Sequence, residues 1–255
     1  MKTGLIKTEE EIRALAEGGR ILADVLRETA AHVKPGISTF ELNEFAEKKI
    51  REHGALPSFK GYQGIKRPFP AGLCTSVNNV VVHGIPKRNE MLKEGDIIGL
   101  DCGVIYKKLF TDAAITVPVG RAGELAQKLM ETTRLALENA IHAAIPGGTI
   151  GDIGYAIQNT VEKRGFSVVR DLIGHGVGYA VHEEPAVPCF GRPGTGVMLE
   201  AGMVLAIEPM VNAGDFRVVF DDEDGWTVRT ADGSLSAHFE HTVAITENGA
   251  VILTE

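Results

Sequence analysis

The hydrophobic pattern opens with two amphipathic helices, each introduced by a capping signal. Thr8 precedes Glu11 by three residues, the spacing of a capping box, and apolar residues then recur at helical intervals to about Val33. A second helix begins at Ser38 with the same signal, and Gly54 provides its C-terminal stop. The N-terminal part of the chain is therefore predicted to form a pair of helices.

The same plan returns in the second half, where helices are expected at about residues 123–144 and 149–165. Apolar runs typical of strands follow the two pairs, at residues 73–82, 97–104, 113–117, 204–211, 227–230 and 239–246. Helices followed by strands, twice and without a Ser- or Pro-rich linker, predict one α+β domain over residues 1–255. Its helices would pack on one side of a curved sheet. The alternative is two independent small domains.

Matching motifs support an internal repeat. A shift of 107 maps three positions of the first half onto the second: Leu92, Gly95 and Asp101 onto Leu199, Gly202 and Glu208. Shifts of 111 and 99 relate the Pro-Gly pairs at 35 and 146 and the Val-His pairs at 82 and 181. Two copies are too few for a solenoid. We therefore expect approximate two-fold symmetry, with acids from both halves converging on a shared site.

Composition narrows the class of protein. The 255 residues are 44% hydrophobic and 24% charged, which is ordinary for a globular domain, and the net charge of −8 argues against broad nucleic-acid binding. Cys74, Cys102 and Cys189 form no disulfide framework, so a reducing compartment is expected. The N-terminus lacks an apolar signal core and no apolar run reaches about 18 residues. These features predict a cytoplasmic chain that binds neither membrane nor specific nucleic acid.

Two acids flank a predicted hairpin whose tip lies near Tyr106-Lys107-Lys108. With a two-residue loop, Asp101 and Asp112 fall on one face of the paired strands, opposite or diagonal. Their neighbours are mostly apolar, and an unpaired buried carboxylate costs several kcal/mol. The alternative is that each aspartate is an isolated hydrogen-bonded residue without a function, but each has an acidic counterpart in the other half. Divalent ions between the acids would remove the cost.

Histidines complete the candidate chemistry. His175 lies among glycines at 174–178, which are expected to let the backbone come close to a ligand. It is either a surface residue or the imidazole of an oxygen-rich site for manganese, iron, cobalt or zinc. A phosphate loop is disfavoured because there is no P-loop lysine. His83 and His182 are related by the repeat, and are either structural or donors to a developing oxyanion or leaving amine. Serine, cysteine and HExxH protease motifs are absent, which leaves hydrolysis by metal-activated water.

Together these residues resemble the methionine aminopeptidases, type I, which have the pita-bread fold. The motifs are Val82-His83-Gly84-Ile85-Pro86, Gly95-Asp96-Ile97, Gly174-His175-Gly176-Val177-Gly178, Ile207-Glu208-Pro209 and Glu240-His241-Thr242. The resemblance implies that two divalent metal ions are bound by Asp101, Asp112, His175, Glu208 and Glu240, with Asp112 and Glu240 bridging. It also implies removal of the initiator methionine from nascent chains when the next residue is small, by a hydroxide that bridges the metals.

Further roles follow from the same resemblance. His182 would bind the scissile carbonyl oxygen, His83 the scissile amide, and Glu208 would shuttle a proton. Three residues would line the methionine pocket, with plain core packing as the alternative: Tyr62, Cys74 and Trp226. Three others would form a monovalent-cation site: Asn78, Val80 and Ser236. A monomer is expected, and contact with the ribosome near the exit tunnel would follow from the substrate.

The sequence also departs from the family pattern. The segment 64–70 is longer than usual, and Phe59 and Val181 stand where other pocket residues are expected, so pocket shape is the open question. One rival is a prolidase or proline-specific aminopeptidase, which carries an additional N-terminal domain. Another is a non-catalytic pita-bread binding module, which has usually lost metal ligands.

Overall fold

The computed structural model describes residues 5–255, and the four residues before them, part of the stretch without an apolar signal core, lie outside that description. Four helices are present in the described chain: α1 (Glu9–His32), α2 (Thr39–Glu52), α3 (Glu124–Ala143) and α4 (Ile150–Lys163). Capping boxes open α1 at Thr8 and α2 at Ser38, as predicted, and a third opens α4 at Thr149. No helix within the described part of the chain combines the length and apolarity needed to cross a bilayer.

Within residues 5–255 the strands form one large antiparallel sheet and two small ones. The large sheet has the order β1-β4-β5-β14-β9-β7-β8, with β2 also paired to β4 and β15 to β14. Its members are β1 (Leu56–Pro57), β2 (Leu73–Val77), β4 (Ile97–Tyr106), β5 (Leu109–Pro118), β7 (Gly174–Gly176), β8 (Glu183–Val187), β9 (Val204–Ile207), β14 (Glu240–Thr246) and β15 (Gly249–Ile252). The small sheets are β13-β10-β6, from Ser236–His238, Met210–Asn212 and Ser167–Val168, and β11-β12-β3, from Val218–Phe220, Val228–Thr230 and Val80–Val82.

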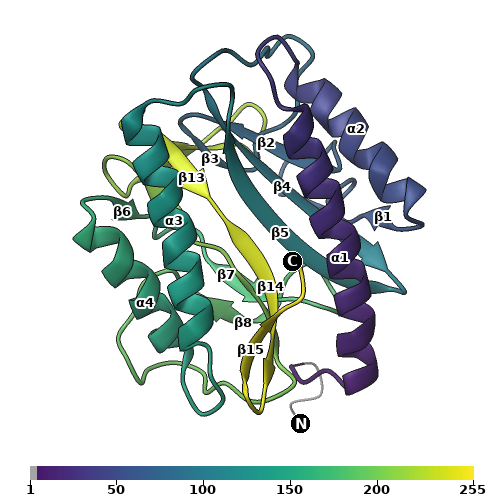
Figure 1. Ribbon diagram of the computed structural model, residues 1–255, viewed down its shortest axis with the longest axis vertical. Coiled ribbons are helices and arrows are strands. Elements are labelled where there is room, and N and C mark those ends of the chain that lie inside the picture. The colour runs from purple at the N-terminus through teal and green to yellow at the C-terminus, as the bar shows by residue number, and fades with distance from the viewer. Residues whose placement is uncertain (1–4) are drawn as a thin grey trace.

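All four helices lie on the same side of the large sheet, as Figure 1 shows. The pair α1 and α2 covers the part built from β4 and β5, and α3 and α4 cover the part built from the second half. Separate apolar clusters lie under the two pairs, one around Leu22, Leu42 and Leu100 and the other around Leu129 and Ile157. The helices thus bury one face of the sheet and leave the other free for chemistry.

The repeat is visible in the backbone. Gly95 and Gly202 share the left-handed conformation, with φ of +91° and +93°. The turns before α2 and α4 are held alike: Gly36 donates its N–H to the Leu92 carbonyl at 2.8 Å, and Gly147 to Leu199 at 2.9 Å. The predicted pseudo-symmetry therefore extends from sequence to hydrogen bonds.

Two predicted strands are each broken in the structure. The strand expected at 73–82 is divided into β2 and β3 at Asn78, which turns the chain with φ of +54°. The strand expected at 204–211 ends at Ile207 and resumes as β10 in another sheet. Pro209 stands at the break, where a residue without an N–H cannot continue the ladder. The short strands β1, β6, β7, β8, β11, β13 and β15 were not predicted.

The glycines beside His175 have a different purpose from the one expected. They lie in strand β7, not in a loop that approaches a ligand. A Cβ on Gly174 would lie 2.4 Å from the Ala206 carbonyl oxygen, and one on Gly176 would lie 2.2 Å from that of Glu184. Glycine is required because the neighbouring strands come too close for any side chain.

The two repeat-related glycines provide a matched stability test. A Cβ at Gly95 meets nothing within 4 Å, whereas one at Gly202 lies 2.7 Å from Ile6 Cγ2 and 3.0 Å from the Lys7 carbonyl oxygen. Gly95→Ala should cost only the backbone strain of about 1–2 kcal/mol, and Gly202→Ala should cost more because the N-terminal segment must also move. Urea unfolding of the metal-free proteins measures both. Equal losses would contradict the predicted contact.

Candidate metal centre

Five neighbouring strands each bring one predicted ligand to the site. Asp101 lies on β4, Asp112 on β5, Glu240 on β14, Glu208 directly after β9 and His175 on β7. Ala114 pairs with both Asp101 and Glu240, and Ala206 pairs with His175. Because directly paired residues and residues two apart share a face, all five side chains lie on one face of the sheet.

The hairpin between β4 and β5 sets this register. Tyr106 pairs with Leu109, so the loop is the two residues Lys107 and Lys108, whose φ angles of +48° and +69° suit a tight hairpin turn. Asp112 pairs with Gly103, two residues beyond Asp101. The two aspartates are therefore diagonal neighbours on one face, which confirms the prediction from loop parity.

The acidic side chains are buried without enough partners. Asp101, Asp112 and Glu240 are only 7%, 4% and 3% exposed. Among the described residues, Asp101 Oδ1, Asp112 Oδ1 and Glu240 Oε1 have no hydrogen-bond partner. Burial raises the pKa of Asp101 to about 7. Burial and the neighbouring acids raise the pKa of Asp112 and of Glu240 well above their usual values. Such a cluster is unfavourable until cations neutralise it.

The donor atoms fit divalent cations. One potential ligand atom from each of Asp112, His175 and Glu240 lies within 4.8 Å of the others, and the same is true of Glu208, His238 and Glu240. His175 Nε2 is 3.5 Å from Glu208 Oε1. Carboxylate oxygens and an imidazole nitrogen are typical ligands of manganese, iron, cobalt or zinc in catalytic sites. Structural zinc sites are instead built mainly from thiolates.

His238 is the site residue that sequence reasoning missed. It lies on β13, almost fully buried, with Nε2 3.5 Å from Glu208 Oε2 and 4.0 Å from Glu240 Oε2. Burial alone would raise the pKa of Glu208, but His238 and His175 outweigh it and hold that pKa below its usual value. The available signal was its position two residues before Glu240, a spacing that places side chains on one face of an extended chain.

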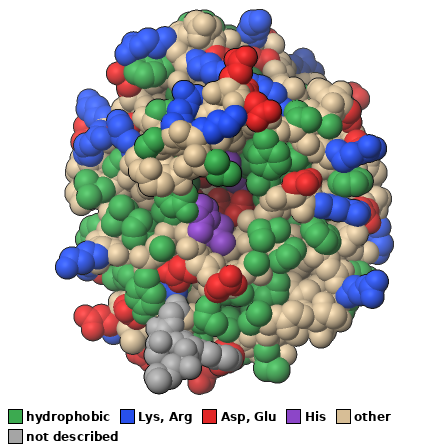
Figure 2. Space-filling model, turned by 180° about the vertical axis from the view of Figure 1, so that it is seen from behind, with side chains coloured by type: hydrophobic (Ala, Val, Ile, Leu, Met, Phe, Trp, Pro, Cys, Tyr) green, Lys and Arg blue, Asp and Glu red, His purple; other side chains and the backbone are tan. Residues whose placement is uncertain are grey.

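The symmetric histidines lie beside the acids, lining the same cavity. His182 is the more exposed of the two, and its ring lies at 75° to that of His175 with centroids 4.4 Å apart. Reduced hydration in the cavity lowers the pKa of His83 and of His182 to about 4, which keeps both rings neutral at pH 7. Figure 2 shows histidine and acidic side chains in a hollow on the face opposite the helices, bordered by hydrophobic side chains.

The predicted pocket residues line this cavity too. Tyr62, Cys74 and Trp226 are joined there by Phe59, Phe69 and Val181. Trp226 packs edge-on against Phe69, with centroids 5.3 Å apart, and against His83 at 6.0 Å. The segment 64–70, which is expected to be longer than usual, contacts the pocket, because the Trp226 indole donates to the Arg67 carbonyl at 3.0 Å. Apolar and aromatic groups thus adjoin the acids directly.

The three residues predicted to bind a monovalent cation lie near one another. The Asn78 carbonyl accepts the Ser236 N–H at 2.8 Å. Val80 begins β3, two residues beyond Asn78. The Ser236 hydroxyl bonds Asn212 Oδ1 at 2.9 Å. A cation site at these residues stays a prediction.

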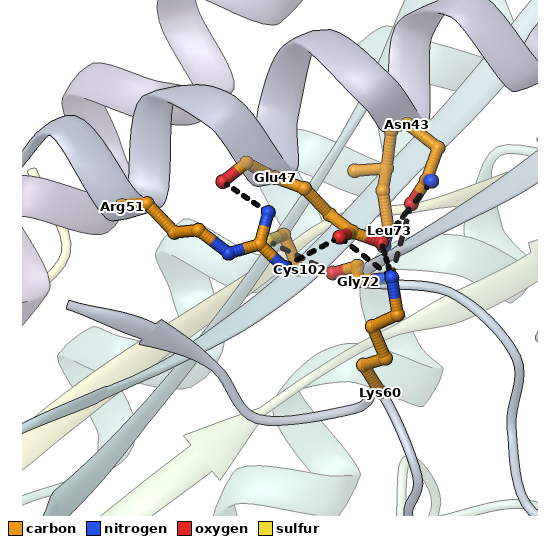
Figure 3. Close-up of polar contacts among 7 residues, drawn as sticks. All are labelled: Asn43, Glu47, Arg51, Lys60, Gly72, Leu73 and Cys102. Atoms are coloured by element: carbon orange, nitrogen blue, oxygen red, sulfur yellow. Dashed lines mark hydrogen bonds and ion pairs between the residues drawn. The ribbon is translucent and has the colours of Figure 1, made fainter.

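A buried carboxylate anchors the loop that carries Phe59, Tyr62 and Phe69 (Figure 3). Glu47 of α2, 5% exposed, accepts hydrogen bonds from Lys60 at 2.8 Å and from the Gly72 N–H at 3.1 Å. Hydrogen bonds from Lys60, Arg51 and Asn43 outweigh burial and lower the pKa of Glu47. Both ends of the loop are thereby tied to one helix.

Glu47→Gln tests that anchor. A neutral amide replaces the charged acceptor of Lys60 and Arg51, so we expect a loss of about 1–3 kcal/mol in stability and a higher KM, with metal content unchanged. Because the pKa of Glu47 is lowered by folding, its contribution is present above the unfolded-state pKa and is lost as pH falls through the folded one. Glu44→Gln, on the exposed side of α2, is the control. Unchanged KM and stability in Glu47→Gln would contradict the anchoring role.

Known proteins resemble this chain in sequence and in fold. The model of metallopeptidase family M24 matches residues 13–247. The methionine aminopeptidase of Clostridium perfringens is 53% identical to this chain, and methionine aminopeptidase 1 of Bacillus subtilis is 49% identical, each match covering 98% of both chains. The crystal structure of the Thermotoga maritima methionine aminopeptidase superposes with a TM-score of 0.94 at 46% identity, covering 98% of both chains.

A more distant neighbour has the same fold with a longer chain. The prolidase of Pyrococcus horikoshii superposes with a TM-score of 0.78 over 99% of this chain and 64% of its own, at 22% identity. The predicted α+β pita-bread fold, with helices on a curved antiparallel sheet, is thus confirmed. The chain belongs to metallopeptidase family M24 and, within it, to the methionine aminopeptidases.

Proposed function

We propose that this metal-dependent aminopeptidase removes the N-terminal initiator methionine from nascent proteins and peptides when the second residue is small. The observation that carries the proposal is the set of five side chains on one sheet face, with unpartnered buried oxygens beside an apolar pocket. A non-catalytic binding module is disfavoured because the complete donor set is kept despite its cost in burial.

The order of the strands supports the assignment of ligands. Asp112 and Glu240 come from the central neighbours β5 and β14, between Asp101 on one side and Glu208 and His175 on the other. Central carboxylates are the ones able to reach two ions, so we assign them the bridging role. Two divalent ions held there would supply a nucleophile from water at neutral pH and polarise the scissile carbonyl. Their identity is proposed as manganese, iron, cobalt or zinc, with one monovalent cation at Asn78, Val80 and Ser236.

The remaining polar groups are assigned to the peptide bond. Neutral His182 is proposed to donate a hydrogen bond to the scissile carbonyl oxygen, and neutral His83 to contact the scissile amide. Glu208, whose pKa is held low by His238 and His175 against the effect of burial, is ionised and able to accept and pass on a proton.

The apolar wall is assigned to the methionine side chain. Tyr62, Cys74 and Trp226 present rings and a thiol beside the acids, and a flexible thioether makes favourable contacts with aromatic edges. Phe59 and Val181 shape the same wall and are the positions at which tolerance for other side chains is decided.

We also propose a cellular setting and an oligomeric state for the enzyme. Three free, buried cysteines fit a reducing cytoplasm, and a nascent-chain substrate would bring the enzyme near the ribosomal exit tunnel. We propose a monomer in which residues 1–255 act as one metallopeptidase domain, since strands from both halves join in one continuous sheet through the pairing of β5 with β14.

Three short peptides test the proposal against its rivals. The protein, supplied with Mn²⁺ or Co²⁺, should cleave Met-Ala peptides, should cleave Met-Lys peptides far more slowly, and should lose both activities with a chelator. Liberated methionine, quantified by chromatography, is the readout. Selective cleavage of Xaa-Pro peptides would favour a prolidase activity, and inertness with or without metal would favour a binding module.

A further inference from the structure

One hydrogen bond links the rim of the pocket to a histidine beside the acids. The Tyr62 hydroxyl lies 2.8 Å from His182 Nδ1, and the two rings meet edge-to-face with centroids 5.2 Å apart. The residues are 120 positions apart, one in the loop before β2 and the other directly before β8. The hydrogen bond therefore occupies Nδ1 of the His182 ring, which also packs against the ring of His175.

The direction of this bond decides where the proton of His182 resides. A neutral imidazole carries one N–H, and its other nitrogen is an acceptor. A phenol is the stronger donor of the pair and an imidazole nitrogen the stronger acceptor, so Tyr62 donates and Nδ1 accepts. The single proton must then be on Nε2.

We propose that Tyr62 is a positioning residue that holds His182 as the Nε2–H tautomer, ready to donate to the scissile carbonyl oxygen. The inference rests on the proposed role of His182. In the opposite tautomer Nε2 would present a lone pair to that oxygen, and the two acceptors would repel each other. The Tyr62 hydroxyl thus orients His182, whereas the Tyr62 ring forms part of the apolar pocket wall.

The backbone around Tyr62 makes this hydroxyl a well-placed donor. The Tyr62 N–H donates to the Phe59 carbonyl at 2.9 Å, and its own carbonyl accepts the Phe69 N–H at 2.9 Å. The same loop is tied to α2 through Glu47 and Lys60 (Figure 3). Tyr62→Phe therefore removes the hydroxyl while leaving the loop and the aromatic wall in place.

Nitrogen NMR reads the tautomer directly. In ¹⁵N-labelled, Zn²⁺-loaded enzyme, long-range ¹H–¹⁵N correlation should show His182 with a protonated Nε2 and an unprotonated Nδ1, the resonance being assigned by its loss in His182→Gln. Tyr62→Phe should give averaged nitrogen shifts typical of mixed tautomers, with kcat about three- to tenfold lower, KM within about twofold and metal content unchanged. Tyr155→Phe, an exposed tyrosine on α4, should match the unmodified enzyme in every measurement.

Two results would overturn the assignment. One is a wild-type His182 protonated on Nδ1, and the other is a Tyr62→Phe variant with unchanged nitrogen shifts and kcat. The tautomer is measured without substrate, so the outcome is separable from the proposed function. Failure of the wild-type enzyme to cleave Met-Ala, with Nε2 protonated, would contradict the function and leave the tautomer assignment standing.

Discussion

The structure depends on keeping acidic side chains together where they repel one another. Asp101, Asp112 and Glu240 are buried, each with an oxygen that no described group satisfies, and the pKa of each is raised by burial. An isolated cluster of this kind costs several kcal/mol per group. In the metal-free protein the rest of the fold must offset this cost, and bound cations remove it by neutralising the acids. Metal binding and stability are therefore two aspects of one constraint.

Sheet geometry is what brings the acids together. Five adjacent strands each provide one donor, and the hairpin at Lys107 and Lys108 fixes the parity that puts two of them on one face. The helices bury one face of the sheet, and the histidines and aromatic rings of the site lie on the other face. The internal repeat explains why both halves are needed, since neither half alone carries the full donor set.

Local signals made much of this predictable. Capping signals located the starts of two helices, the two-residue loop predicted that Asp101 and Asp112 share one face, and the repeat paired Asp101 with Glu208. The resemblance to methionine aminopeptidases then supplied the ligand set, which the structure brings together. These features depend on spacing along the chain, and spacing is what a sequence contains.

Other features depend on contacts between distant segments and left little local signal. His238 lies on β13 of a small sheet, and its side chain reaches Glu208. This sheet exists because the predicted strand is interrupted at Pro209 and resumes as β10, the partner of β13. Glu47 and Lys60 are 13 positions apart, one in a helix and the other in a loop, yet their side chains meet at 2.8 Å. The glycines around His175 suggested ligand access, whereas the spacing of β7 from its neighbours requires them.

Calorimetric titration of the metal-free protein with Zn²⁺ or Mn²⁺ at pH 7, in two buffers of different ionisation enthalpy, tests the central claim most directly. Burial raises the pKa of Asp101 to about 7 and the pKa of Asp112 and Glu240 well above normal, so metal binding at pH 7 should displace protons from the cluster. The account predicts two ions per chain, with proton release that appears as a buffer-dependent heat, and fewer ions in Asp112→Asn. Binding without proton release, or two ions bound equally well by Asp112→Asn, would contradict it.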